Sequence, residues 1–207
     1  MIARNWGEEP HDATPLGPEE FNQLIPTDVA TRSDLNAVER DNILSARLWA
    51  FAQRGVSDVD RLLQTSTLDA IHRRMFGNVW RWAGKRRTNV TNIGAEPAQI
   101  VTRLKDALDD ARYWHDHDTF DRVETAVRIH HRLVQVHPYA NGNGRHARFV
   151  ADLYLHVIGE AALGWKPDES DASDSRRAYI AALQLADRGD YSQLIPYAAN
   201  CASTPSE

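Results

Sequence analysis

The twelve residues HPYANGNGRHAR, at positions 137–148, concentrate residue types that could do chemistry. His137 precedes a proline, and a residue before proline is disfavoured in the α-helical region, so the helical pattern upstream must end near it. The residues YANGNG that follow tolerate positive φ, so successive backbone N–H groups can turn inward as a concave nest. A second helical pattern begins at once and brings its unsatisfied amides to the same point. The stretch therefore predicts an anion-binding cradle.

Helical spacing places four polar side chains on one sector of the helix predicted at 144–159, namely Arg145, Arg148, Asp152 and His156. The rest of that helix is largely apolar, which predicts a central position in the fold. Two guanidiniums in a buried first turn oppose the helix dipole unless an anion compensates them. Polyphosphate is the obvious anion. His137 beside it, with an ordinary pKa near neutrality, could take a proton from an incoming hydroxyl.

Two other interpretations of this stretch remain open from the residues alone. GNGRHA satisfies the dinucleotide fingerprint G-x-G-x-x-G/A, but that fingerprint follows a buried strand, whereas a helical pattern and His-Pro precede it here. The stretch could also be an ordinary turn between helices whose arginines form surface pairs. The combination of nest, arginines and histidine favours the anion site.

One helical domain is the architecture that the rest of the chain predicts, because 207 residues can bury one good core. Apolar spacing predicts helices at 33–53, 58–64, 67–77, 97–116, 121–137 and 144–159, with a last helix and a short closing helix within 175–200. The proline-rich residues 1–30 predict an extended arm, and residues 201–207 a frayed tail. RTNVTNIGA, at 87–95, alternates as a short exposed hairpin does, and it could also be merely a surface loop.

Composition limits the classes of partner. The formal net charge of −5 gives no overall basic field, so we expect no direct contact with nucleic acid. No apolar run approaches the length of a membrane span, and the N-terminus lacks the apolar core of a secretory signal, so we expect no membrane contact. The single cysteine, Cys201, fits a reducing compartment, and we expect a cytoplasmic protein.

HPYANGNGRHAR closely resembles the signature of the Fic (Fido) family, which reads His, Pro, an aromatic, any residue, an acid, Gly-Asn-Gly-Arg, two free positions and Arg. LDAIHRRMFGNVWRWAGKRRTNVTNIG, at 68–94, resembles the family's segment leading into its target-positioning hairpin, and RRAYIAALQLADRGD resembles its closing helix. ATPLGPEEFNQLIP with VWRWAGK is similar to the bacterial group called mobile mystery protein B. The resemblance implies an all-α Fic/Fido helical bundle with a small β-hairpin flap, over residues 31–200.

Family members mostly transfer AMP from ATP to a hydroxyl of a target protein, so the resemblance implies a protein adenylyltransferase. His137 would then be the general base for a target Ser, Thr or Tyr hydroxyl. The nucleotide-binding positions would be Gly142, Asn143 and Gly144 on the α- and β-phosphates, Arg145 on the β-phosphate side and Arg148 on the γ-phosphate. The flap that docks the target would be Thr88, Asn89, Val90, Thr91, Asn92 and Ile93. Trp80 and Trp82 would anchor the core and the hairpin.

Asn141 departs from the family pattern, because it stands where the family has the acid that holds Mg²⁺. An amide oxygen can bind a hard cation but brings no charge, so metal affinity should fall. The sequence GNGR also argues against the family's phosphate-transferring toxin branch, which has a lysine there.

Glu39 lies on the apolar stripe of the helix predicted at 33–53, where a carboxylate needs a cationic or donor partner. Arg148 is a natural partner, and many Fic proteins inhibit themselves through such a pair. Pairing of Glu39 with Arg40, Arg47 or solvent is the alternative. Three other activities stay open: transfer from another nucleotide donor, removal of AMP, and nucleotide binding without catalysis, in a toxin–antitoxin-like module with a small DNA-binding companion.

Overall fold

Helices make up the fold in the computed structural model, which describes residues 22–52, 56–165 and 174–199. No strand forms within these ranges, so the predicted all-α class is confirmed. The elements in chain order are α2 (Arg32–Phe51), α3 (Val59–Leu62), α4 (Thr65–Phe76), the 3-10 turn η1 (Pro97–Gln99), α5 (Ile100–Asp116), α6 (Arg122–Val136), α7 (Asn143–Val157), α8 (Asp174–Ala186) and α9 (Leu194–Ala199).

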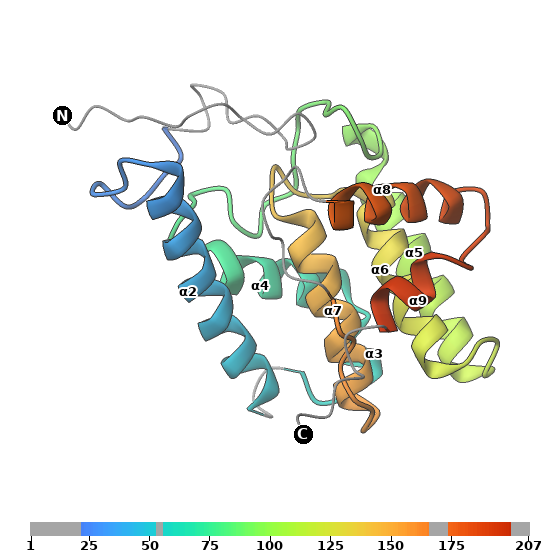
Figure 1. The fold of residues 1–207 in the computed structure, drawn as a ribbon. Helices are drawn as coiled ribbons and strands as arrows, with labels where there is room; N and C mark the ends of the chain where they lie inside the picture. The colour runs from blue at the N-terminus through green and yellow to red at the C-terminus, as the bar shows by residue number, and fades with distance from the viewer. Residues whose placement is uncertain (1–21, 53–55, 166–173, 200–207) are drawn as a thin grey trace, which may run out of the picture.

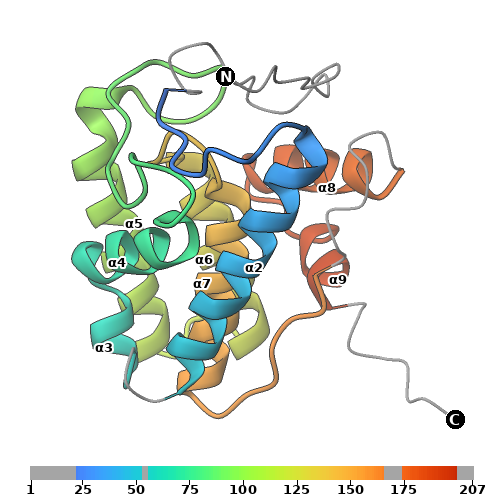
Figure 2. The same cartoon turned by 90° about the vertical axis from the view of Figure 1, so that its left-hand side faces the viewer.

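Helix α7 runs through the centre of the molecule, as its nearly continuous apolar surface predicts. It packs against α2, α3, α4 and α6. Figure 1 places α2 on one side of α7 and α8 on the other, and Figure 2, turned by 90°, brings α2 to the front. The first turn of α7 is thereby held among helices from both halves of the chain.

The helix ends follow local capping chemistry. Thr31 caps α2 in a capping box with Asp34. Asp58 caps α3 and Asp121 caps α6 through their side chains. A side chain that accepts an orphan amide fixes where a helix begins, so the predicted start of each of these helices is met within two residues.

The hairpin predicted at 87–95 does not form. This segment, which we call the flap loop, is irregular, and its one ladder-like contact is an isolated bridge between the neighbouring Arg86 and Tyr139. The guanidinium of Arg87 donates to the carbonyls of Asn89 and Ala95, which removes acceptors that a hairpin ladder requires. The loop is therefore curled around a side chain instead of being paired strand to strand.

Two groups of buried apolar side chains hold the helices together. The larger group lies among all the helices from α2 through α7. The smaller group joins α8 and α9 to α6 through Val127. Of the predicted arm, residues 22–30 are described, and Leu24 forms a bridge with Trp80 there. Residues 1–21 of the arm and the predicted tail 201–207 lie outside the described residues.

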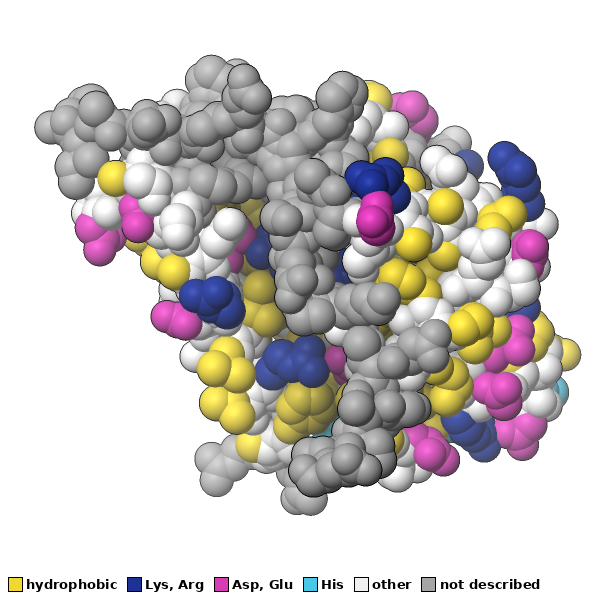
Figure 3. Space-filling model, in the orientation of Figure 1, with side chains coloured by type: hydrophobic (Ala, Val, Ile, Leu, Met, Phe, Trp, Pro, Cys, Tyr) yellow, Lys and Arg dark blue, Asp and Glu magenta, His cyan; other side chains and the backbone are white. Residues whose placement is uncertain are grey.

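The surface in the orientation of Figure 1 carries acidic and basic side chains that are interspersed, with no single basic field (Figure 3). This distribution agrees with the formal net charge of −5. Within the described ranges, no helix has both the length and the apolarity needed to cross a membrane.

Candidate active site

The signature loop, residues 137–142, connects the two central helices through two left-handed residues. Helix α6 ends at Val136, and His137 follows with φ 52° and ψ 60°. Gly142, with φ 76°, then leads into α7. Left-handed backbone turns the chain sharply, and this sharp turn brings the imidazole of His137 and the start of α7 to one end of the two helices.

The N-terminus of α7 has no side-chain cap among the described residues. Its first helical bond is donated by His146 N–H to Gly142 O at 2.9 Å, so the amides of Asn143, Gly144 and Arg145 precede the helix's own ladder. Uncapped amides at the positive end of a helix dipole suit an anion. Three main-chain amides are thus left without a helical acceptor where the sequence predicts the cradle.

The side-chain amide of Asn143 is used within the loop and is not presented to this cradle. Its Oδ1 accepts from Tyr139 N at 2.9 Å, and its Nδ2 donates to Tyr139 O at 2.8 Å. The side chain is buried and braces the loop from within. A buried amide that satisfies both backbone groups of one residue is a structural clamp, so Asn143 can meet a phosphate only through its main chain.

Tyr139, at the aromatic position of the signature, is fully buried and anchors the same loop. Its hydroxyl donates to Asp69 Oδ1 at 2.9 Å, and its ring stacks on His72 with a centroid distance of 3.7 Å. Asp69 therefore satisfies the one polar group of this buried side chain.

The two glycines of the cradle differ in their surroundings. A Cβ on Gly142 would lie 2.5 Å from Cζ of Phe76, whereas a Cβ on Gly144 would meet nothing within 4 Å. Position 142 thus requires glycine for two reasons: its φ is positive, and the ring of Phe76 leaves no space for a Cβ. Gly144 keeps the floor of the cradle open.

His137 is 7% exposed. Burial, followed by the positive charge of Arg87, lowers the pKa of His137 to about 4. A hydrogen bond to the carbonyl of Val134 raises the pKa and partly offsets this shift. The imidazole is therefore neutral at physiological pH and able to accept a proton.

Arg145 forms an ion pair with Glu39 of α2. The distance from its Nη1 to Glu39 Oε2 is 2.6 Å, and Trp80 Nε1 donates to the other carboxylate oxygen, also at 2.6 Å. The expectation that Arg148 would be the partner of Glu39 is therefore wrong for the described contacts. The guanidinium of Arg148 lies over the ring of Tyr179 instead, 4.9 Å from its centroid. One helical turn separates the two arginines, and α2 approaches α7 on the side of Arg145.

The sector predicted from helical spacing divides in two along α7. Asp152 is buried and binds Arg47 Nη2 at 3.1 Å and Trp165 Nε1 at 3.0 Å. His156 packs its edge on Phe51. Both residues serve packing near the far end of α7, away from the cradle.

Asn141 uses its side chain within the loop. Its Oδ1 accepts from Gly142 N at 2.6 Å, and its main-chain oxygen accepts from His72 Nε2 at 3.1 Å. Among the described residues, no group of three or more His, Cys, Asp or Glu side chains could hold a metal. A divalent cation would therefore find one neutral ligand here, which suits a metal carried by a nucleotide.

The predicted docking residues extend from the flap loop beside His137. Val90 is 70% exposed and Ile93 is 51% exposed. Gly94 lies so close to His137 that a Cβ on Gly94 would be 2.4 Å from the Cβ of His137. The loop thus carries exposed apolar side chains on a segment whose backbone approaches His137 at Gly94.

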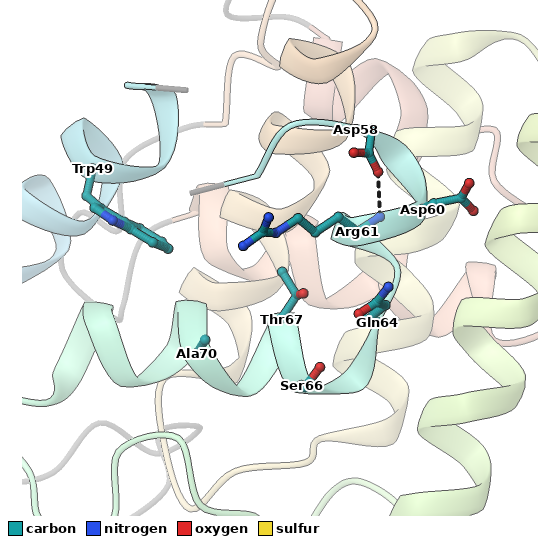
Figure 4. A pocket seen from close by; sticks show the side chains of 8 residues that line it. All are labelled: Trp49, Asp58, Asp60, Arg61, Gln64, Ser66, Thr67 and Ala70. Atoms are coloured by element: carbon teal, nitrogen blue, oxygen red, sulfur yellow. Dashed lines mark hydrogen bonds between the residues drawn. The ribbon is translucent and has the colours of Figure 1, made fainter. Parts of the chain in front are cut away.

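A separate groove of roughly 620 Å³ lies between the end of α2 and the helices α3 and α4 (Figure 4). Its lining consists of Trp49, Asp58, Asp60, Arg61, Gln64, Ser66, Thr67 and Ala70. None of the residues predicted from the signature lines this groove.

The sequence profile of the Fic/DOC family matches residues 62–155, the segment that runs from α3 through the signature loop to α7. Over this segment, the chain is similar to the Fic/DOC family. Protein adenylyltransferase fic-1 of Caenorhabditis elegans is 29% identical over 191 residues, which cover 87% of this chain and 32% of that protein. The chain therefore spans about a third of the length of that curated relative.

Solved Fic structures have the same fold. The structure of residues 134–508 of C. elegans Fic-1 has a TM-score of 0.63 and 25% identity, covering 89% of this chain and 52% of that one. BepC of Bartonella tribocorum, solved with bound AMPPNP, has a TM-score of 0.62 and 17% identity, covering 92% of this chain and 100% of that one.

Two residues of this candidate site have contacts that the sequence does not predict. Trp80 was interpreted as a core anchor, and it also binds Glu39. Arg87, the first residue of the flap loop, is only 7% exposed. The alternation of RTNVT could not single it out, because its partners are backbone carbonyls, which carry no signal in the sequence.

Proposed function

We propose that the chain is a protein adenylyltransferase, which transfers AMP from ATP to a Ser, Thr or Tyr hydroxyl of a target protein. The observation that carries the proposal is the uncapped start of α7 beside a buried, neutral His137. The adenylyltransferase name of the C. elegans relative and the nucleotide bound to BepC support it.

In the proposed reaction, the target hydroxyl oxygen attacks the α-phosphorus and its proton passes to His137. The bond from that phosphorus to the bridging oxygen breaks, and pyrophosphate leaves with its electron pair. The main-chain amides of Asn143 and Gly144 would hold the α- and β-phosphates. The amide of the third predicted residue, Gly142, donates to Asn141 Oδ1 and would have to leave it to join them. Arg145 would neutralise the leaving pyrophosphate, and Arg148 would meet the γ-phosphate. Positioning and fixed positive charge are the main resources for such a transfer.

Mg²⁺ is the proposed metal, held mostly by the triphosphate, with Asn141 as one neutral ligand. When bound, the ion would neutralise charge on the bridging phosphates. Since the Oδ1 of Asn141 already accepts the Gly142 amide at 2.6 Å, only its second lone pair is open to a cation. Weak metal dependence is the expected consequence.

Glu39 is the proposed regulator of this site, within a Fic domain of residues 31–200. Its carboxylate holds Arg145 at 2.6 Å, so a triphosphate must take the guanidinium away from a buried partner. The proposal differs from the sequence-based expectation in naming Arg145 as the residue that α2 withholds.

The second candidate is a nucleotide-binding protein that does not catalyse, the regulated half of a module with a small DNA-binding companion. Two observations favour it: the neutral Asn141 at the metal position and the closed Glu39–Arg145 pair. The finer assignment to the bacterial mobile mystery protein B group and to the cytoplasm stays a prediction, based on VWRWAGK and on the single cysteine.

Labelled ATP tests the proposal. Wild-type chain, Glu39→Gly and Glu39→Gly with His137→Ala would each be incubated with bacterial extract and ATP labelled at either the α- or the γ-phosphate. We expect protein label from α-labelled ATP only, more with Glu39→Gly than with wild type, and none with His137→Ala. Asp41→Gly, an exposed position on α2, is the matched control for the cost of a helical glycine. ATP binding without label in every variant would favour the second candidate, and label from γ-labelled ATP would rule out AMP transfer.

A further inference from the structure

Arg87 carries a buried positive charge that meets backbone carbonyls. Its Nε donates to His137 O at 2.7 Å and its Nη1 to Asn89 O at 2.8 Å, while its Nη2 donates to Ala95 O. Among the described residues, no carboxylate lies within ion-pair distance of it, and Glu96 acts on it only from farther away. Burial lowers the pKa of Arg87, so the charge is expensive to keep in place.

The three acceptors belong to two separate segments. Asn89 and Ala95 are the two arms of the flap loop, and His137 is the first residue of the signature loop. Two main-chain bonds reinforce the link: Arg87 N to Pro138 O at 2.9 Å and Ala95 N to Val136 O at 3.1 Å. A guanidinium has a rigid, planar fork of donors, so it fixes the angles between its acceptors as well as their distances.

We propose that Arg87 is a positioning residue that sets the register between the flap loop and His137, through one guanidinium shared by both backbones. The inference rests on the proposed function. An extended target segment would lie against the flap loop, and its hydroxyl must then arrive at the imidazole within a few tenths of an ångström. Arg87 supplies this alignment before any target binds.

The same guanidinium acts on the imidazole through its charge. Burial is the largest cause of the lowered pKa of His137, and the positive charge of Arg87 is the second. The hydrogen bond to the Val134 carbonyl raises the pKa and so opposes both. Removal of the charge should raise the pKa of His137, whereas a lysine should keep the pKa low without spanning three carbonyls. Charge and alignment can therefore be separated by two substitutions.

The experiment compares wild type, Arg87→Gln, Arg87→Lys and Arg86→Gln. Arg86 is the matched control, because it is the neighbouring arginine and pairs with the Asp69 side chain instead. Two measurements need no activity: NMR titration of the His137 ring, assigned with His137→Ala, and hydrogen exchange of the Arg87 and Ala95 amides. A third measurement is the rate of target labelling against the dissociation constant of ATP.

We expect the His137 pKa to rise above about 4 in Arg87→Gln and to stay near the wild-type value in Arg87→Lys and Arg86→Gln. Amide exchange should quicken in both Arg87 variants. Labelling should fall on the order of 10- to 100-fold in both, with ATP affinity unchanged. If Arg87→Gln does not fold, faster exchange in Arg87→Lys carries the test.

The inference is overturned if both Arg87 variants match Arg86→Gln in exchange and in His137 titration. Faster exchange and a shifted titration in a chain that never labels protein would leave Arg87 as described and count against the proposed function alone. The two failures are thus distinguishable.

Discussion

Gly142 determines the shape of the cradle at the scale of a single residue. Its φ of 76° is costly for any residue with a Cβ, and the ring of Phe76 occupies the place that a Cβ would take. We therefore predict that Gly142→Ala lowers the free energy of unfolding by about 2–4 kcal/mol, from backbone strain and overpacking together.

Gly144→Ala is the control for that prediction, since its Cβ would enter open space on a helix. Its free energy of unfolding should change by less than about 1 kcal/mol, with any change toward greater stability, because alanine favours helix over glycine. Urea unfolding of both variants measures the difference. Equal stability of the two alanine variants would show that the left-handed turn at Gly142 is not a constraint.

Buried histidines connect the helices at the scale of elements. The Nε2 of His146 on α7 donates to the Leu68 carbonyl of α4, and His130 on α6 contacts the Tyr179 hydroxyl of α8. His72 on α4 accepts from Gly84 N–H through Nδ1, so its Nε2 carries the proton that is donated to the Asn141 carbonyl. Each contact is made by a neutral ring.

Protonation of these rings should destabilise the fold. Burial lowers the pKa of His72, His130 and His146, and the value for His146 falls from 6.5 to about 4. The unfolded chain takes up protons below pH 6.5 while the folded chain does not, so stability is full above pH 7 and falls as the pH decreases from 6.5 toward 4. His146 alone corresponds to roughly 3 kcal/mol.

Thermal unfolding between pH 7.5 and 4.5 checks this direction. His146→Gln, which keeps a polar side chain, should show a shallower loss of stability over the same window than wild type. The Asp152 carboxyl, whose pKa burial raises, works in the opposite direction at acid pH. A wild-type stability that is flat from pH 7 to 5 would contradict the neutral-ring account.

The elements themselves could be predicted from sequence, whereas several of their partners could not. A 3.6-residue apolar period is a local signal, and it predicts α6 and α7 within two residues of their ends. Glu39 forms its ion pair with Arg145 and not with Arg148 because of the way α2 approaches α7. No local sequence pattern encodes that approach. The side-chain amide of Asn143 hydrogen-bonds the backbone of its own turn. The sequence GNG is equally compatible with a side-chain contact to phosphate, so it could not predict which of the two forms.

At the scale of the whole molecule, α2 connects the core to the candidate site. It contributes Leu35, Ala46 and Ala50 to the main core, and Glu39 reaches from its buried face to Arg145. Trp80 holds the second carboxylate oxygen. If Glu39 regulates the site as proposed, the packing of α2 and the state of the cradle are coupled. Regulation in this account is a matter of whether one buried ion pair or a triphosphate satisfies Arg145.

A crystal structure of Glu39→Gly with a non-hydrolysable ATP analogue and Mg²⁺ tests the central claim most directly. We predict phosphate oxygens within hydrogen-bond distance of the Asn143 and Gly144 amides, with the guanidinium of Arg145 turned to them and the α-phosphorus facing His137. A nucleotide seated elsewhere, such as in the groove beside Trp49, with the start of α7 in contact with solvent alone, would contradict it.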